Sequence, residues 1–389
     1  MPTLRTGRKG RSGRGGRGST ATLTPQQYNA QRLATLATQP QKRVRMPPAS
    51  KLIIARYARE LTPIADQAYA IANRTVIRAV EAQQAIADAE GIADAMTTRQ
   101  KIKAFLAGRR SATKAIRAAA QNVPHSPEQK EALDLPPDVK RAIADMEAQI
   151  AKMVAALGNP AFQIAPAVEA AAATANEAAM TSLGLKVIDP GTKLAALEQR
   201  WLEQNASLIK SIPREVADQV RQKVATMVPQ GARWETIAKE LRAEHGIAKR
   251  RAELIARDQV GKYNSALAQT RMQACGIAAY SWSGAQDNRE RASHLALQGS
   301  VWTWDKPPPI GPPGSQIRCR CVSVPITSND LAKNASTLTP EQLQARMVAI
   351  GPRDDDPPDI TREQLEKRSA RELKGEIRLQ AEFVKSRMV

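Results

Sequence analysis

Apolar residues recur at intervals of three and four through much of the N-terminal half of the chain. Between residues 52 and 90, the positions at this spacing include Ile64, Tyr69, Ile71, Val76 and Val80. Such spacing places apolar side chains on one face of an α-helix. Prolines, which break helices, interrupt the pattern in two pairs, Pro124 with Pro127 and Pro136 with Pro137. Residues 50–187, rich in alanine, are therefore predicted to be a mostly helical region.

A second helical pattern follows a turn predicted at residues 188–194. One helical face collects the residues Trp201, Leu202, Asn205, Leu208, Ile209 and Ile212. Pro213 is predicted to lie in the first turn of a new helix, where its missing N–H costs nothing. Further along, Gly246 after His245 is predicted to be a left-handed C-cap that joins two helices.

These two helices have two interpretations. The segment is either a plain helical hairpin or a helix-turn-helix that reads DNA. Its second helix carries apolar residues along its whole length, namely Leu254, Ile255, Val260 and Leu267. A helix with this pattern needs burial, so the plain hairpin is favoured.

After Gly276 the pattern changes from helical spacing to alternation, which is typical of strands. Three short strands are predicted, in AAYSWSG, VWTW and CRCVSVP, with a rigid loop PPPIGPPG before the last. Within CRCVSVP, Cys319 and Cys321 are predicted to share one face of the strand, with Arg320 on the other. The predicted fold class is mainly α (α+β): a helical N-terminal region, then a helical bundle capped by a small antiparallel β-element.

Positive charge is concentrated at the N-terminus. The chain has a net charge of +20, and residues 1–59 contain thirteen Lys or Arg and no acidic residue. Residues 1–49 are predicted to be a disordered basic arm, because glycine and mutual repulsion oppose folding. Its candidate DNA-binding residues are Arg5, Arg8, Lys9, Arg11, Arg14 and Arg17. The arm could bind phosphates without sequence preference or act only as a solubilising tail.

The remaining composition limits the compartment. No apolar segment resembling a secretory signal follows the basic stretch, and no apolar run is long enough for a membrane span. The three cysteines, Cys275, Cys319 and Cys321, are too few and odd in number for a disulfide framework. We therefore expect a protein made in a reducing cytoplasm, without membrane contact. Cys275 is expected to be a small core residue.

The β-rich segment contains polar and special residues in a specific order. They are Tyr280, Trp282, Asp287, Arg289, Arg291, His294, Gly299, Trp304, Asp305, Pro307, Pro308, Pro313, Gly314 and Cys319-Arg320-Cys321. This order resembles the closing signature of the phage Mu F-like head-morphogenesis family. The upstream segments WLEQNASLIKSIPREV, WETIAKEL and RRAELIARDQVGKYN resemble that family too. The resemblance covers residues 195–326, and residues 327–389 follow as a charged tail with two predicted helices.

His294, Cys319 and Cys321 are residue types that bind zinc, which usually takes four ligands in a structural site. Members of the family often have Cys-x-x-Cys where this chain has Arg291 and His294, and a further His near the position of Gly314. The chain therefore departs from the pattern, with Asp287 as a candidate oxygen ligand. We expect no cofactor here, but a metal-free cluster in which Asp287, Arg289 or Arg291, and His294 are hydrogen-bonded. Bound zinc is the alternative.

The resemblance implies a minor head protein of a tailed bacteriophage, located in the virion at the head interior or portal vertex. The implied partners are the portal protein, the major capsid or scaffolding protein, and phage DNA, with roles in genome packaging or ejection. An enzyme is not expected, because the chain lacks a Gly-rich phosphate loop, a nucleophile elbow and a His-Glu-x-x-His motif. The alternatives are a nucleoid-type DNA-binding protein, or a nuclease or toxin-like enzyme fused to a head domain.

Overall fold

The computed structural model describes residues 23–97, 135–328, 332–333, 335–353, 356–357 and 359–388. In the first half, the elements are α1 (Pro25–Ala37), α2 (Lys51–Ala72), a π-helical turn η1 (Asn73–Ile77), α3 (Arg78–Thr97), α6 (Pro137–Ala156) and α7 (Ala161–Ser182). In the second half, they are α8 (Thr192–Met227), α9 (Trp234–Ala274), β1 (Ala279–Ser283), α10 (Ala292–Ala296), β2 (Val301–Thr303), β3 (Val322–Ile326), α12 (Pro340–Ile350) and α13 (Arg362–Met388). The predicted fold class, mainly α with a small β-element, is confirmed.

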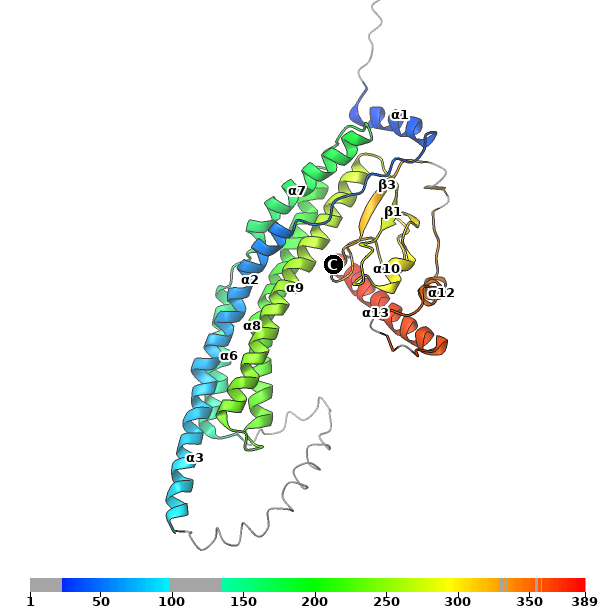
Figure 1. Cartoon of the computed structure of the whole chain (residues 1–389). Coiled ribbons are helices and arrows are strands. Elements are labelled where there is room, and N and C mark those ends of the chain that lie inside the picture. The colour runs from blue at the N-terminus through cyan, green and yellow to red at the C-terminus, as the bar shows by residue number, and fades with distance from the viewer. Residues whose placement is uncertain are drawn as a thin grey trace, which may run out of the picture.

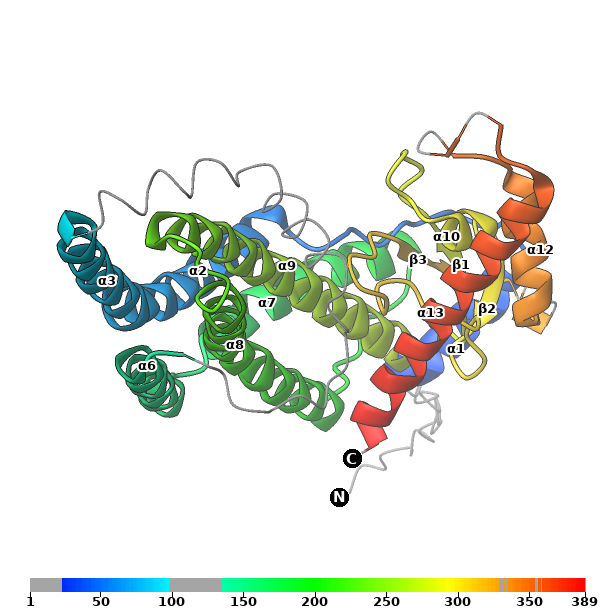
Figure 2. The same cartoon turned by 90° about the horizontal axis from the view of Figure 1, so that it is seen from below.

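Helices α2, α6, α7, α8 and α9 pack side by side into an elongated bundle (Figures 1 and 2). One continuous apolar core runs between them, and many of its buried residues are alanines. Small side chains allow helix axes to approach closely, as the alanine-rich composition suggests. The helical periodicity predicted between residues 52 and 90 is confirmed by α2, η1 and α3. The chain is helical again after the second proline pair, and this helix, α6, already begins at Pro137. The break predicted at Pro124 and Pro127 lies outside the described residues.

Helix α8 continues through Pro213, so the prediction that a helix begins there is wrong. Pro213 is buried inside α8, as are Ile209, Ile212 and Val216 around it. An interior proline costs about 3 kcal/mol. Burial of three large aliphatic side chains against the bundle contributes about 1.5–3 kcal/mol each, which exceeds that cost. Packing therefore overrides the local preference.

Helix α9 also continues through Gly246, and the predicted C-cap there is wrong. Gly246 has no left-handed backbone conformation, and buried residues lie on both sides of it, Leu241 before and Ala252 after. The neighbouring His245 contacts Asp66 of α2 (Nε2–Oδ1 2.7 Å) and stacks on Tyr69 at 4.4 Å between ring centroids. A glycine inside a helix costs about 1 kcal/mol, less than the about 1.5–3 kcal/mol that burial of a side chain such as Leu241 contributes. Because there is no turn at this point, both interpretations of this segment are wrong, the favoured helical hairpin as well as the helix-turn-helix.

The sheet is three-stranded and antiparallel, with the order β2-β1-β3. Tyr280 of β1 pairs with Trp302 of β2 and with Pro325 of β3. The predicted third strand is shorter than expected, because it begins at Val322 and leaves Cys319 and Cys321 in the preceding segment. Because Cys319 and Cys321 precede the strand, the alternation of side chains along a strand does not fix their direction, and both thiols point toward His294 of α10. In Figure 1 the sheet, α10, α12 and α13 lie beside α9.

Part of the predicted N-terminal arm is folded. Helix α1 begins with a capping box, in which the Thr24 hydroxyl accepts a hydrogen bond from Gln27 N while the Gln27 side chain accepts one from Thr24 N. Asn29 then exchanges two hydrogen bonds with the backbone of Lys186, at 2.8 and 2.7 Å. The prediction of a disordered arm through residue 49 is therefore wrong for residues 25–37, because a local cap and a long-range amide contact stabilise the helix. Residues 1–22 lie outside the described residues.

The charged tail packs against the sheet. Leu343 and Met347 of α12 and Leu373 of α13 are buried in the same apolar core as Tyr280 and Trp282. The first of the two helices predicted in this tail is α12, where Thr339 forms a capping box with Gln342. The C-terminal helices and the sheet therefore share one core. Among the described helices, none is both long and apolar enough to span a bilayer.

Candidate functional site

Three of the residues singled out in the sequence meet next to the sheet. The Nδ1 atom of His294, in α10, lies 3.3 Å from Sγ of Cys321 and 3.6 Å from Sγ of Cys319. The three candidate ligand atoms all lie within 4.8 Å of one another. His294 and Cys321 are buried and Cys319 is half-buried. We call these three residues the His-Cys-Cys cluster.

The turn that follows α10 is hydrogen-bonded to strand β1. Trp282 of β1 donates its backbone N–H to Ser300 O and accepts a hydrogen bond from Gly299 N, each at 2.9 Å. Gly299 follows α10 with φ of +76°, a conformation that glycine adopts at little cost. The Trp282 ring meets His294 edge-on at 5.4 Å between centroids. The backbone turn at Gly299 and the Trp282 ring together fix where His294 lies.

The loop before β3 brings the two thiols to His294. Gly314, at the end of the Pro/Gly loop, donates its backbone N–H to Sγ of Cys319 at 3.3 Å. Gly314 has φ of +84°, and a Cβ at this position would lie 1.9 Å from Ser265 Oγ of α9. Glycine is therefore needed at this position both for the backbone conformation and for the close approach to α9.

Glu290 is a fourth polar residue of the site, and no pattern in the sequence indicated it. Its side chain is buried, with Oε1 3.3 Å from Sγ of Cys321. Its other oxygen, Oε2, accepts the backbone N–H of Gln286 at 2.5 Å. A single glutamate between Arg289 and Arg291 gives no pattern in the sequence, and only the turn before α10 points it inward. The one feature of the sequence that could have indicated Glu290 is its position three residues after Asp287, which was itself a candidate ligand.

Asp287 does not point toward the His-Cys-Cys cluster, contrary to its prediction as an oxygen ligand. Its carboxylate forms a bidentate ion pair with Arg320, which includes a 2.6 Å contact between Arg320 Nη2 and Oδ1. This hydrogen bond to Arg320 holds the pKa of Asp287 at about 2. The Asp287 Oδ1 atom also accepts the backbone N–H of Arg289, whose side chain is exposed. Arg320 thus draws Asp287 to the surface, and Glu290 takes the inner position.

Arg291 links the cluster to the C-terminal helix. Its Nη1 lies 3.4 Å from Nε2 of His294, and its Nε lies 3.5 Å from Oε1 of Glu376 in α13. Glu376 is buried, and its other oxygen accepts a 2.6 Å hydrogen bond from the Ser293 hydroxyl. Of the predicted hydrogen-bonded cluster, Arg291 contacts His294, whereas Asp287 and Arg289 form a separate group with Arg320. Glu376, far away in sequence, is a further contact that the sequence did not indicate.

The two thiols differ in acidity because they touch. The neighbouring Cys321 thiol and His294 hold the pKa of Cys319 well below its ordinary value. Cys319 and burial together raise the pKa of Cys321. The pKa values of the two thiols are therefore shifted in opposite directions. Cys275, predicted as a core residue, is buried at the end of α9, and burial raises its pKa as well.

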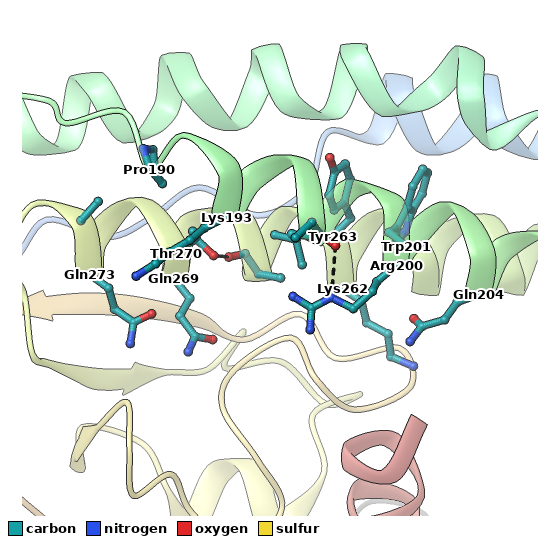
Figure 3. A pocket seen from close by; sticks show the side chains of 14 residues that line it. Pro190, Lys193, Arg200, Trp201, Gln204, Lys262, Tyr263, Gln269, Thr270 and Gln273 are labelled. Atoms are coloured by element: carbon teal, nitrogen blue, oxygen red, sulfur yellow. Dashed lines mark hydrogen bonds between the residues drawn. The ribbon is translucent and has the colours of Figure 1, made fainter. Parts of the chain in front are cut away.

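A cavity lies between the N-terminal part of α8 and the C-terminal part of α9 (Figure 3). This cavity of about 480 Å³ is lined by cations, amides and aromatic rings, namely Lys193, Arg200, Gln204, Lys262, Gln269, Gln273, Trp201 and Tyr263 among others. Trp201 and Tyr263 stack at 4.7 Å between centroids, and Lys262 is paired with Asp258 at 2.8 Å. The residues that line this cavity do not include any residue of the His-Cys-Cys cluster.

The candidate DNA-binding residues Arg5, Arg8, Lys9, Arg11, Arg14 and Arg17 lie outside the described residues. Their role therefore stays a prediction from charge alone. After α1, residues 38–49 reach the sheet, where Met46 N donates to Ser323 O at 3.3 Å and Arg45 Nη2 donates to Gly284 O at 3.0 Å. The chain leading from the basic segment is thus attached to the sheet beside the cluster.

Comparison with known proteins identifies the segment that contains the cluster. Residues 218–324 match the family model described as Phage Mu protein F like protein. Over 143 residues the chain is 34% identical to an uncharacterized protein of Haemophilus influenzae (strain ATCC 51907 / DSM 11121 / KW20 / Rd), which covers 36% of this chain and 32% of that protein. The chain therefore matches about a third of the length of this curated relative. No solved structure matches the chain.

The matched range begins within α8, includes all of α9, and ends in β3. It contains every residue of the ordered motif from Tyr280 to Cys321, including the His-Cys-Cys cluster. The resemblance inferred from that motif is confirmed, and residues 218–324 form a segment like the phage Mu protein F.

Proposed function

We propose that this chain is a minor head protein of a tailed bacteriophage that acts with the portal in head assembly. The observation that carries this proposal is the family match at residues 218–324. In the structure that range contains α9 and the three strands, with α9 in contact with β3. The proposed site of action is the head interior or the portal vertex, with the major capsid or scaffolding protein as a further partner.

The geometry of the motif residues favours a structural role over catalysis. His294, Cys321 and Glu290 are buried and face one another. A catalytic group has to reach a substrate, whereas these groups contact segments of the same chain. We propose that the motif holds α10, the Pro/Gly loop and the sheet in one arrangement, which presents a fixed surface to partner proteins.

We further propose that the basic arm contacts packaged DNA. Six cations among glycines would neutralise phosphates without reading bases, so this binding should weaken steeply as salt increases. A nucleoid-type DNA-binding protein is the competing function. This alternative has less support, because the segment considered as a helix-turn-helix is part of one continuous helix, α9.

The test is co-expression with the portal and major capsid proteins of the same phage, followed by affinity capture in high salt with nuclease present. We expect the portal to remain bound. A variant with Arg5, Arg8, Lys9, Arg11, Arg14 and Arg17 all changed to Gln should still retain the portal but lose DNA at low salt. Loss of every protein partner after DNA digestion would contradict the assembly role and favour the nucleoid-type alternative.

A further inference from the structure

The geometry points to a structural zinc site formed by His294, Cys319, Cys321 and Glu290. The sequence indicated three ligands, His294, Cys319 and Cys321, and Asp287 as a possible fourth. Because Asp287 is paired with Arg320, the fourth ligand has to be another residue. Glu290 is the candidate for it, because its Oε1 lies 3.3 Å from Cys321 Sγ on the inner side of the turn before α10. The Glu290 carboxylate lies outside the group of three ligand atoms that are within 4.8 Å of one another, so its side chain would have to move toward the ion. A nitrogen, two sulfurs and one carboxylate oxygen are a ligand set that zinc accepts.

The distances between the ligand atoms suit a tetrahedral ion. Zinc bonds of about 2.0 Å to nitrogen and 2.3 Å to sulfur, at the tetrahedral angle, separate the two atoms by about 3.5 Å. The separations of His294 Nδ1 from the two sulfurs are 3.3 and 3.6 Å. A zinc ion would therefore require little movement of these three side chains.

Burial indicates a closed site rather than an open one. The exposed fractions of His294, Cys321 and Glu290 are 2%, 3% and 6%, and Cys319 is half-buried. Catalytic zinc keeps a ligand position for water or substrate, whereas structural zinc has all four positions filled by the protein. The ligands come from the turn before α10, from α10 itself and from the segment before β3. An ion here would join these three segments of the small C-terminal unit.

The surroundings provide outer contacts of the kind that orient metal ligands. Gly314 N donates to the Cys319 sulfur at 3.3 Å, and Gln286 N donates to the oxygen of Glu290 that faces away from Cys321. With two thiolates and one carboxylate, the four ligands and Zn²⁺ carry a net charge of −1. The guanidinium of Arg291, next to His294, would partly offset this charge.

His294 also distinguishes the zinc site from a metal-free cluster. Without metal, Nδ1–H would donate to a thiolate while Nε2 accepts from Arg291 Nη1, a contact of 3.4 Å. With zinc on Nδ1, Nε2 must carry the proton, and the Arg291 guanidinium has to turn away from it. Arg291 would keep its contacts with Ile317 O and Glu376. The tautomer of His294 therefore differs between the two states.

The experiment is elemental analysis of the purified full-length chain, after dialysis against metal-free buffer. We expect about one zinc ion per chain in the wild type, and loss of that zinc in Cys321→Ser and His294→Gln. Cys275→Ser is the matched control, because Cys275 is also buried but lies away from the cluster, and it should retain zinc. Glu290→Gln should weaken zinc affinity by at least roughly 10- to 100-fold, the loss typical of removing an outer-shell partner of a metal ligand.

Cobalt substitution of the wild type keeps the test independent of variants that fail to fold. Cobalt bound by two thiolates should give near-ultraviolet charge-transfer absorption, and zinc should abolish it on addition. In nitrogen NMR, the zinc form should show His294 protonated at Nε2. Wild-type protein without zinc and without the cobalt absorption would overturn the proposal, as would equal zinc loss in Cys275→Ser and Cys321→Ser.

Discussion

At the scale of single residues, the sequence indicates which residues belong to the site, but it does not indicate which residues they contact. His294, Cys319 and Cys321 were recognisable by type and order, and they meet in the structure. Glu290 and Glu376 were not, because a lone glutamate in a charged chain has no distinguishing pattern. Glu376 reaches Ser293 across 83 positions of sequence, and only the packing of α13 brings them together. Asp287 was misplaced because nothing local indicated that Arg320 would take it as a partner.

Two buried asparagines allow a direct measurement of what a satisfied polar group contributes. Asn205 of α8 accepts a 2.8 Å hydrogen bond from the Tyr57 hydroxyl and donates to Trp201 O at 2.7 Å. Asn205→Ala would leave the buried Tyr57 hydroxyl without its acceptor. Leaving such a group unsatisfied costs about 1–3 kcal/mol, and we expect a loss of unfolding free energy of this size in denaturant titration.

Asn176 of α7 is the matched control. It is equally buried, but within the described part of the chain neither polar atom of its side chain has a hydrogen-bond partner. Asn176→Ala should therefore change the unfolding free energy by less than about 1 kcal/mol. Equal losses of unfolding free energy in the two variants would contradict this prediction, because they would show that the Tyr57–Asn205 hydrogen bond makes no extra contribution to stability.

At the scale of elements, the predictions succeeded where periodicity was long and failed where a single residue was given too much weight. The faces of α2 and α8 and the antiparallel strands followed from spacing alone. Pro213 and Gly246 were each treated as helix ends, yet both lie inside helices that are buried along their length. A local preference of 1–3 kcal/mol does not end a helix whose continuation buries several large side chains. The extra partners of α1 and α13 depend on distant segments, so the sequence pattern could not supply them.

Gly246 provides a test at this scale. If α9 is continuous, Gly246→Ala should stabilise the protein by about 0.5–1 kcal/mol, because alanine restricts the unfolded chain and favours helix. An added Cβ would meet only the flexible end of Arg250, at 3.5 Å. The thermal unfolding midpoint should therefore rise.

Gly299→Ala is the opposite case, since Gly299 has φ of +76° and open space around its Cβ position. The strain of a left-handed alanine should destabilise the protein by about 1–2 kcal/mol. A destabilising effect of Gly246→Ala, similar to that of Gly299→Ala, would instead support a left-handed cap and a break in α9.

At the scale of the whole molecule, two folded parts are joined through α9. The bundle has its own continuous core, and the sheet with α10, α12 and α13 has another. Residues 38–49 run between them and attach the N-terminal segment to the sheet. A basic N-terminal arm held in this way would have a fixed point of attachment next to the Mu F-like segment. That arrangement suits a protein that contacts both protein partners and DNA, which is the role proposed above.

Depletion of this protein from a phage that encodes it tests that role most directly, with heads counted by electron microscopy and by encapsidated DNA. The proposal predicts fewer DNA-filled infectious heads, and full rescue by the wild-type protein supplied in trans. The variant with all six basic arm residues, Arg5 to Arg17, changed to Gln should rescue assembled heads but not their full DNA content or infectivity. Normal numbers of filled, infectious heads in the absence of the protein would contradict the proposal.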